Sequence, residues 1–409
     1  MKNTIIILSI LLNACLIDSI ESQWIQDNVI PQSRYVNTLT VMGNNLLAGT
    51  GTWARSGKVY LSSDNGNTWN PISFSQIFYS LDISGNYIFA GVNHYYGLYY
   101  TTDIGSTWTQ AIPLNMMSQH AKSVLANGSN VYVGGEGPGH FAVSTNYGTN
   151  WVITSLNKNI ASILSNGSYL YAGTSGEGVF VSTNNGSNWV QSSLNDKKVS
   201  SMFVKDNKIF AGTIGNGIFT STNNGLSWSQ NSLNYQSVRD FAQSGIFLFA
   251  GTEKDGIYVT TNDGINWSQR NEGIPLTDSI LSLCVFNNYI FAGSSDGVWR
   301  RPLSEFTGIK NISVQIPNDY YLDQNYPNPF NPVTKIKFDI PSSVETSRWD
   351  VLITIHDVLG KEIAILVNQQ LQPGTYEADW DASAYPSGVY YYKLESGGFS
   401  ETKKMVLIK

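Results

Sequence analysis

Five acidic side chains stand in short, Gly-rich turns and are the chain's candidates for acid–base chemistry. They are Glu136, Glu177, Glu253, Asp255 and Asp296. Cleavage of a glycosidic bond requires two carboxyl groups at a set separation across a cleft, one to protonate the leaving group and one to attack or to activate water. The sequence does not give these separations, so a glycoside hydrolase that uses these turns stands as the alternative interpretation of the chain.

Aromatic, basic and imidazole side chains occupy the same kind of turn and the segments that lead into the following strands. The set is Arg34, Tyr35, Trp53, Arg55, His94, Tyr95, Tyr96, His120, His140, Tyr235 and Arg239. Aromatic and polar side chains mixed on a concave rim suit the binding of a glycan or a protein. We therefore expect these residues and the five acidic ones to form a binding face, and we assign no catalytic residue. For any single residue, an ordinary solvated turn is the competing interpretation.

Metal and cofactor chemistry finds little support in the sequence. The histidines are His94, His120, His140 and His356, and none has the spacing of paired zinc ligands. Cys284 lies in an apolar run and is expected in the core, without a histidine partner that would make it a nucleophile. The net charge of −6 provides no basic footprint for nucleic acid. We predict no metal site, no cofactor and no nucleic-acid partner.

A turn motif that ends in tryptophan recurs six times, at intervals of 38 to 43 residues. Its pattern is Ser/Thr-x-Asp/Asn-x-Gly-x-Ser/Thr/Asn-Trp, and the first copy runs from Ser62 to Trp69. The third residue can accept hydrogen bonds from backbone amides and close the turn, while glycine permits a positive φ. We expect each tryptophan to be buried against a neighbouring sheet. The third residues and tryptophans are Asp64, Trp69, Asp103, Trp108, Asn146, Trp151, Asn184, Trp189, Asn223, Trp228, Asn262 and Trp267.

A second mark precedes each motif, an apolar run that ends in Ala-Gly or Gly-Gly or a similar small pair. These runs number seven, from Leu46–Gly49 to Ile290–Gly293, and they are expected in an inner strand near the axis of the fold. Short β-rich segments joined by Asn-Gly and Asp-Gly turns give about four strands per repeat, the content of one propeller blade. The last repeat lacks the motif, and Trp24 with its neighbours resembles the missing strand. Residues 23–306 are therefore predicted to form an all-β, seven-bladed β-propeller closed by its own N-terminus.

The two faces of such a propeller have different roles. The tryptophan motifs lie between the third and fourth strands of each blade, at one end of the strands. Turns between the second and third strands, and the crossovers between blades, lie at the other end and differ from repeat to repeat. We therefore expect the binding face on the side opposite the motif.

The repeated motif resembles the Asp-box, or BNR repeat, of sialidases and of many non-sialidase propellers. The resemblance covers residues 23–306 and implies a structural role for the box. The Arg-Ile-Pro element of sialidases is absent, and Arg300-Arg301-Pro302 stands at the end of the last repeat instead. Propellers of photosystem assembly share similar repeats, which leaves an assembly factor as a third interpretation.

Beyond Phe306 the tryptophan period stops. Residues 307–320 are predicted to be a linker, and the alternation in residues 321–409 predicts an immunoglobulin-like β-sandwich. Four segments in this region resemble the type A C-terminal sorting domain of the type IX secretion system of Bacteroidota: Tyr326 to Pro332, His356 to Glu362, Pro386 to Leu394 and Lys403 to Lys409. The resemblance implies export across the outer membrane and the secretion machinery as a partner.

The first 22 residues carry a short apolar run, Ile5 to Leu12, after Met1-Lys2-Asn3. This pattern predicts a secretory signal peptide, with lipidation at Cys15 as an alternative to ordinary cleavage before Trp24. The chain has no other long apolar run and no transmembrane segment is expected. We expect a monomer that is secreted or held at the cell surface, associated with the outer membrane.

Overall fold

The computed structural model describes residues 23–27, 30, 35–93, 97–111, 120–137, 141–306, 309–313, 315–342, 349–382 and 385–409. The predicted signal peptide, with Cys15, lies outside these residues. The described part is all-β, as expected, and consists of repeated four-stranded antiparallel sheets and a single 3₁₀ turn, η2 (Leu303–Glu305). No helix of the described part is long and apolar enough to cross a membrane.

Most of the N-terminal sheets each use four consecutive strands, in chain order. The first contains β2 (Val36–Met42), β3 (Asn45–Thr52), β4 (Arg55–Ser62) and β5 (Asn70–Pro71). The second sheet contains β6 (Phe78–Ser84), β7 (Tyr87–Val92), β8 (Leu98–Thr101) and β9 (Thr109–Gln110), and the third contains β10 (His120–Asn127), β11 (Asn130–Glu136), β12 (Phe141–Ser144) and β13 (Val152–Ile153). The fourth contains β14 (Ile160–Asn166), β15 (Tyr169–Thr174), β16 (Val179–Ser182) and β17 (Val190–Gln191), and the fifth contains β18 (Val199–Lys205), β19 (Lys208–Thr213), β20 (Gly217–Ser221) and β21 (Ser229–Gln230). The sixth contains β22 (Val238–Ser244), β23 (Phe247–Thr252), β24 (Ile257–Thr260) and β25 (Ser268–Gln269).

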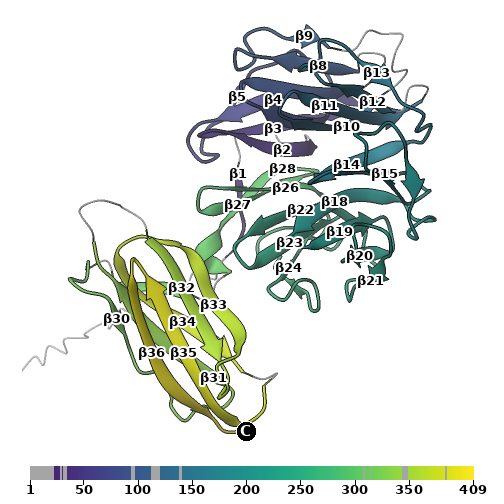
Figure 1. Cartoon of the computed structure of the whole chain (residues 1–409). Coiled ribbons are helices and arrows are strands. Elements are labelled where there is room, and N and C mark those ends of the chain that lie inside the picture. The colour runs from purple at the N-terminus through teal and green to yellow at the C-terminus, as the bar shows by residue number, and fades with distance from the viewer. Residues whose placement is uncertain are drawn as a thin grey trace, which may run out of the picture.

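The remaining sheet of this region joins the two ends of the repeats. It contains β26 (Ile280–Phe286), β27 (Tyr289–Ser294) and β28 (Gly297–Pro302), and its outer strand is β1 (Ile25–Asp27), which pairs antiparallel with β28. Figure 1 shows the purple β1 beside the green β28. The prediction that the N-terminal residues supply the missing strand is confirmed. Trp24 is buried, and its indole N–H donates to the carbonyl oxygen of Arg270 at 2.7 Å.

The first strands of these sheets contact one another in a cycle. β2 contacts β6, β6 contacts β10, and the series continues through β14, β18, β22 and β26, which contacts β2 again. The outer strands of the sheets are two or three residues long, so each sheet presents little unpaired edge.

The small pairs lie in the second strand of each sheet rather than in the strand on the axis. Their glycines face the first strand of the following sheet. A Cβ atom on Gly91 would lie 2.5 Å from the carbonyl oxygen of Ala121, and one on Gly134 would lie 2.4 Å from the Ile160 Cγ2 atom. The small residues are therefore required by close approach between sheets, in an inner strand of each sheet.

Hydrogen bonds within the repeated motif close its turn, between the third and fourth strands as predicted. In the first copy the Ser62 hydroxyl accepts from the Gly66 amide at 2.8 Å, and Asp64 Oδ1 accepts from the Thr68 amide at 2.8 Å. The Thr68 side chain and amide hold the pKa of Asp64 below its usual value. Asparagine serves equally in later copies, because Asn146 Oδ1 accepts from the Asn150 amide at 2.8 Å.

The tryptophans link each sheet to the one before it. The Trp69 indole N–H donates to Asp27 Oδ2 at 2.6 Å, and the Trp108 indole N–H donates to the Ile72 carbonyl oxygen at 2.9 Å. Trp69 is buried at 5 % exposure. The expectation that each tryptophan is buried holds only in part for the other copies, whose side chains are of intermediate exposure: Trp108, Trp151, Trp189, Trp228 and Trp267.

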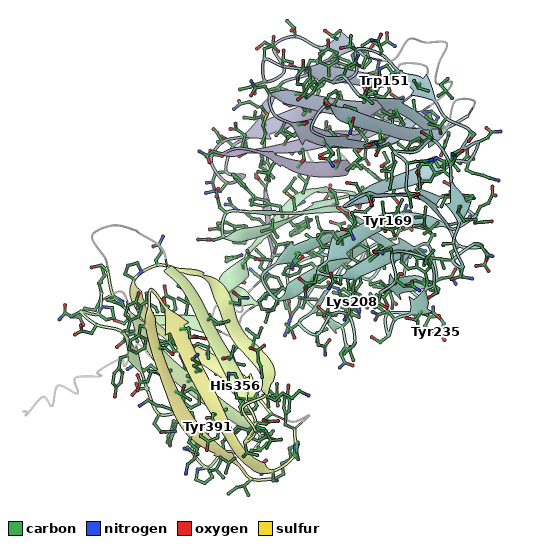
Figure 2. The ribbon with its side chains drawn as sticks, viewed as in Figure 1. Trp151, Tyr169, Lys208, Tyr235, His356 and Tyr391 are labelled. Carbon is green, nitrogen blue, oxygen red and sulfur yellow. The ribbon has the colours of Figure 1, made fainter. Side chains whose placement is uncertain are left out.

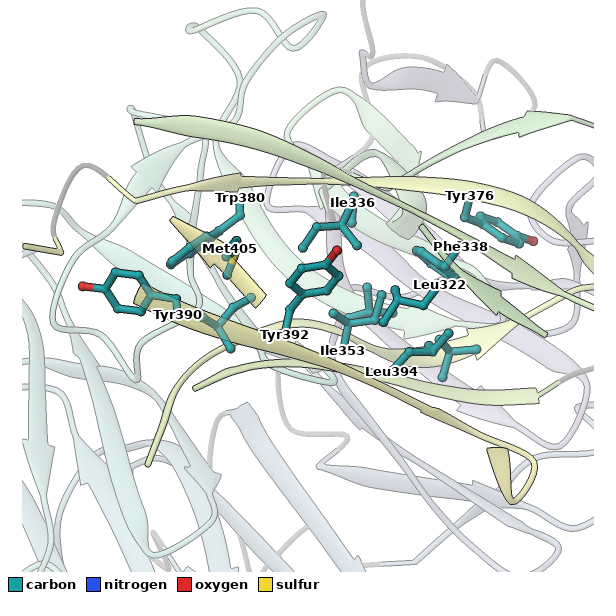
Figure 3. Close-up of a cluster of buried hydrophobic side chains, with 14 of the residues drawn as sticks. Leu322, Ile336, Phe338, Ile353, Tyr376, Trp380, Tyr390, Tyr392, Leu394 and Met405 are labelled. Atoms are coloured by element: carbon teal, nitrogen blue, oxygen red, sulfur yellow. The ribbon is translucent and has the colours of Figure 1, made fainter. Parts of the chain in front are cut away.

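The C-terminal region forms two further four-stranded sheets, in the orders β29-β34-β31-β30 and β33-β32-β35-β36. Their strands are β29 (Ile309–Ser313), β30 (Tyr321–Leu322), β31 (Val333–Ile340), β32 (Trp349–His356), β33 (Glu362–Leu371), β34 (Gly374–Asp381), β35 (Gly388–Ser396) and β36 (Phe399–Leu407). Figure 3 shows the buried side chains between them, among them Trp380, Tyr392 and Leu394. The assignment of residues 307–320 to a linker is wrong for β29, because Ile309–Ser313 pairs with β34 and extends the sheet.

Candidate functional site

Every first strand carries a β-bulge at the same place, so one extra residue in each strand is turned out of the regular ladder. In β2 the register shifts between Val36 and Thr38, and the extra residue is Asn37. Bulges re-aim side chains and occur often beside functional sites. The equivalent extra residues are Asn37, Tyr79, Lys122, Ala161, Ser200, Arg239 and Leu281, which we call the bulge ring.

The whole bulge ring lines one cavity of about 510 Å³. Because its lining comes from the first strand of every sheet in the cycle, the cavity lies on the axis of the propeller, and we call it the axial cavity. Its volume is in the range of sites for small ligands. Glu136, at the end of β11, also lines it.

The residue after each bulge is Ser, Thr or Asp in every sheet, in contrast to the varied bulge ring. It is Thr38, Ser80, Ser123, Ser162, Ser201, Asp240 or Ser282. The Ser80 hydroxyl accepts from the Val124 amide of the next sheet at 3.1 Å, and Ser123 accepts likewise from the Ile163 amide at 3.0 Å. Thr38, Asp240 and Ser282 also bond to the neighbouring first strand, whereas the hydroxyls of Ser162 and Ser201 have no hydrogen-bond partner within the described protein. The bulge ring varies more in side-chain type than these positions do.

The charged members of the site are held in pairs. Lys122 Nζ lies 3.7 Å from the centroid of the Tyr79 ring and 4.0 Å from Glu136 Oε1. Burial lowers the pKa of Lys122, against the opposing effect of Glu136, and burial raises the pKa of Tyr79 to about 12. Arg239 Nη2 donates to Glu253 Oε2 at 2.9 Å. Each cation of the bulge ring therefore has an acidic neighbour.

Four buried polar atoms of the cavity lining have no hydrogen-bond partner within the described protein. They are Tyr79 Oη, Ser162 Oγ, Ser201 Oγ and Arg239 Nε. Ser162 and Ser201 are only 8 % and 6 % exposed. Each of these atoms exposes less than 1 Å², and a Cβ atom on Gly173 or Gly212 would lie 2.5 Å from Ser162 Oγ or Ser201 Oγ. The two serine hydroxyls therefore face the second strand of their own sheet rather than the open cavity.

Aromatic side chains gather beside the cavity lining. The ring of His120 is 5.1 Å from that of Trp53 and 5.9 Å from that of Tyr79, and His120 Nε2 is 4.0 Å from Glu136 Oε2. Trp53 is 64 % exposed, which is high for an indole and places a flat apolar surface in contact with solvent.

Part of the predicted binding face is thus brought together. Trp53, His120 and Glu136 form one group, and Arg239 with Glu253 forms a second that reaches the same cavity through Arg239. Sequence reasoning missed Tyr79 and Lys122. An alignment of the repeats would have found them, because it shows one changing residue ahead of a constant Ser, Thr or Asp.

Other predicted residues do not line the cavity. Glu177 pairs with Lys158, and Tyr235 is 80 % exposed at the edge of the propeller, where Figure 2 labels it. The remaining described ones are Tyr35, Arg55, Asp255 and Asp296, which lie in turns or at strand ends. Arg34, His94, Tyr95, Tyr96 and His140 lie outside the described residues.

The lining contains two carboxyl groups, and only one of them is available for chemistry. Asp240 accepts from the amides of Leu283 and Phe241, both at 2.8 Å, and burial raises its pKa to about 7. Glu136 therefore has no second carboxyl group within the described lining to act with it in glycoside hydrolysis. Burial also raises the pKa of the Cys284 thiol to about 12, which leaves it protonated at neutral pH. Among the described residues no cluster of three or more His, Cys, Asp or Glu side chains is placed to hold a metal ion.

Comparison with known proteins separates the two regions of the chain. A family model described as "Secretion system C-terminal sorting domain" matches residues 324–409. No match was found among curated proteins. YCF48 from Cyanidioschyzon merolae is similar to this chain with a TM-score of 0.53 at 16 % identity, covering 69 % of this chain and 98 % of that chain.

Two further solved structures share the fold. The WD40 β-propeller domain of Doa1 has a TM-score of 0.53 at 14 % identity and covers 68 % of this chain and 96 % of that chain. The GH74 enzyme of Niastella koreensis has a TM-score of 0.56 at 11 % identity and covers 95 % of this chain and 75 % of that chain. At these identities the similarity establishes the fold alone. The chain is thus a β-propeller followed by a secretion-system C-terminal sorting domain.

Proposed function

We propose that this chain is a secreted or surface-displayed binding protein without catalytic activity, whose axial cavity and neighbouring aromatic side chains hold a glycan or a protein partner. In this proposal residues 23–306 form a closed seven-bladed Asp-box propeller. Residues 321–409 form an immunoglobulin-like sandwich that the type IX secretion machinery recognises, after a signal peptide has directed the chain across the inner membrane.

The bulge ring is the observation that carries the binding proposal. Selection for a stable ring alone would be satisfied by one side chain at every bulge, as it is by the Ser, Thr or Asp that follows. The ring instead presents a lysine, an arginine, a tyrosine and smaller side chains around one cavity. Polar groups that converge on one cavity fix the orientation of a bound ligand.

A glycoside hydrolase is the second candidate, since the GH74 enzyme shares the fold. The carboxyl groups of the lining argue against it, because Asp240 is engaged by two backbone amides and Glu136 stands next to Lys122. If the chain hydrolyses a polysaccharide and Glu136→Gln abolishes the activity, the non-catalytic proposal is wrong.

The binding proposal is tested on a glycan array and a peptide array with the full chain and with Arg239→Ala. We expect a ligand that the full chain retains and the variant loses or holds weakly. Tyr235→Ala provides the matched control, because that exposed side chain lies away from the cavity and its loss should leave the signal unchanged. Equal signals from all three proteins would remove the axial cavity from the proposal.

The export proposal has its own test, deletion of residues 321–409 in a bacterium with the type IX system. We expect the truncated chain to accumulate in the periplasm and the intact chain to reach the surface or the medium. Display of both forms at the cell surface would contradict the assignment.

A further inference from the structure

We propose that the folded chain loses side-chain ammonia spontaneously at Asn127 and Asn166, and that its other Asn-Gly steps resist this reaction. Water is the only co-reactant, and the modification does not depend on what the axial cavity binds. The sequence contains six such steps, which begin at Asn65, Asn127, Asn166, Asn185, Asn216 and Asn224. Hydrogen bonding, exposure and free space at the glycine divide them into a group of two and a group of four.

The reaction begins at the backbone nitrogen that follows the asparagine. That nitrogen gives up its proton and attacks the side-chain carbonyl carbon, Cγ, and the carboxamide takes up a proton and leaves as ammonia. Water then opens the resulting succinimide ring at either of its carbonyl groups, which yields aspartate or isoaspartate. Glycine favours the attack because it has no Cβ atom to obstruct the ring. A folded chain can therefore promote or prevent the reaction through the state of the glycine N–H.

Four of the six glycine amides are already bonded. In the three copies of the tryptophan motif that contain Asn-Gly, the glycine N–H donates to the hydroxyl of the serine that opens the turn, at 2.8 to 2.9 Å. These pairs are Gly66 with Ser62, Gly186 with Ser182 and Gly225 with Ser221. Outside the motif, the Gly217 N–H donates to the carbonyl oxygen of Gln236 at 2.8 Å. Attack at these four steps has to break a hydrogen bond first.

The glycine amides after Asn127 and Asn166 make no hydrogen bond within the described residues. Gly128 and Gly167 lie in the turns that join β10 to β11 and β14 to β15, outside the paired positions of either ladder. Both glycines are exposed, whereas the glycines of the other four steps are buried. Solvent therefore reaches the attacking nitrogen at these two steps.

Free space around the glycine separates the same two groups. A Cβ atom on Gly128 or Gly167 would meet no atom within 4 Å, so a succinimide ring has room to form there. In the motif, by contrast, a Cβ atom on Gly225 would lie 2.8 Å from Cε1 of Tyr171, which belongs to β15 of the preceding sheet. The motif turns are thus held by their serine and by the packing of their glycine.

Deamidation changes both the charge and the backbone of the two open turns. Each event replaces a neutral carboxamide by a carboxylate, and an isoaspartate adds a methylene group to the chain between two strands. The Gly128 carbonyl oxygen accepts from the Ser84 hydroxyl of the second sheet at 2.8 Å, so the turn at Asn127 lies at a junction between sheets. The modification therefore adds negative charge and weakens one contact between the second and third sheets.

The experiment is peptide mapping by mass spectrometry of the full chain after prolonged incubation in mildly alkaline buffer. Conversion is followed at each of the six steps, and isoaspartate is identified by enzymatic methylation. We expect Asn127 and Asn166 to convert first. The four bonded steps should be slower by at least about 3- to 10-fold, the factor that one hydrogen bond of ordinary strength gives.

Two controls separate the effect of structure from that of sequence. In concentrated urea the same chain keeps its sequence and loses its hydrogen bonds and packing, so all six steps should convert at similar rates. Ser182→Ala removes the hydroxyl that holds the Gly186 amide, so conversion at Asn185 should rise while conversion at Asn127 stays the same. Thermal unfolding of the variant checks that the fold is retained.

The relative rates decide the assignment. Similar rates at all six steps of the folded chain, or conversion at any bonded step ahead of Asn127 and Asn166, would overturn it. A folded chain in which no step converts, while the urea-treated chain does convert, would also overturn it, because the open turns would then protect their asparagines as well as the motif does. An unchanged rate at Asn185 in Ser182→Ala would show that the serine hydrogen bond is not what protects the motif.

Discussion

Replacement of Trp69 by alanine tests how the propeller is closed. Trp69 is 5 % exposed and its indole N–H donates to Asp27 Oδ2 at 2.6 Å, across the junction between the first sheet and the N-terminal strand β1. Truncation removes nearly all of a contact surface of roughly 150–250 Å² and that hydrogen bond. Large-to-small changes of buried aromatic residues cost about 3–5 kcal/mol, which lowers the Tm of a domain of this size by roughly 6–15 °C.

The assay is urea and thermal unfolding of the intact chain, followed by circular dichroism, with hydrogen exchange at β1 as a local readout. We expect the loss of stability to be accompanied by faster exchange of the Ile25 to Asp27 amides. Trp151→Ala is the matched control, because that indole is partly exposed and bonds to Ala111 in the middle of the cycle, so its replacement should cost less and leave β1 protected. A loss below about 1 kcal/mol for Trp69→Ala, with β1 unaffected, would refute the closing role of this contact.

Two further changes probe the first strands and the turns. Burial raises the pKa of Asp240 to about 7 from an ordinary 3.8, so the folded state holds the proton more tightly and stability falls as the pH rises from about 4 through 7. Asp240→Ser, which copies Ser201 and Ser282 at the equivalent positions, should remove that fall in stability, which is worth roughly 4 kcal/mol at most and less where the carboxyl group reaches the cavity. Denaturant unfolding from pH 4 to pH 9 measures the free energy of unfolding of both proteins. The same dependence of that free energy on pH in the variant would contradict the assignment. Gly178→Ala should prevent stable folding, because its Cβ would lie 1.7 Å from the Leu194 carbonyl oxygen, whereas Gly43→Ala meets no atom within 4 Å and should cost only about 1 kcal/mol for its positive φ. Equal thermal stability of the two alanine variants would show that close approach is not what requires glycine at position 178.

The architecture was predictable because the chain repeats it. The tryptophan motif, the Ala-Gly pairs and the Asn-Gly turns mark the strands of each sheet, and the unmatched Trp24 identified the pairing of β1 with β28. The burial of the tryptophans was overestimated, because the motif fixes the turn while the exposure of each indole depends on its neighbours in the preceding sheet: Trp69 alone meets the N-terminal strand, through Asp27. The linker assignment failed at β29, because five residues without strong alternation do not reveal a partner strand as distant as β34.

The candidate site was only partly predictable. Trp53, His120 and Glu136 were found because unusual side chains in turns are conspicuous. Tyr79 and Lys122 were not, because they lie inside strands, where aromatic and aliphatic stems are expected for packing. Their exposure to the cavity depends on a bulge, and a bulge is visible only when the register of two paired strands is known.

Neighbouring positions of each first strand differ in how much they vary. The residue after the bulge is Ser, Thr or Asp in every sheet and bonds to the next sheet in five of the seven, at Thr38, Ser80, Ser123, Asp240 and Ser282. The bulge residue itself lines the axial cavity, and Asn37 and Ser200 also donate to carbonyl groups of the next sheet. Variation at the bulge ring can therefore change the lining of the axial cavity without removing the bonds that these five residues make.

A crystal structure of the chain soaked with the ligand that binds most tightly on the glycan or peptide array tests the central claim most directly. The account predicts density for that ligand in the axial cavity, in contact with side chains of the bulge ring such as Arg239. Density on the face of the tryptophan motifs, with an axial cavity that holds only water, would contradict it.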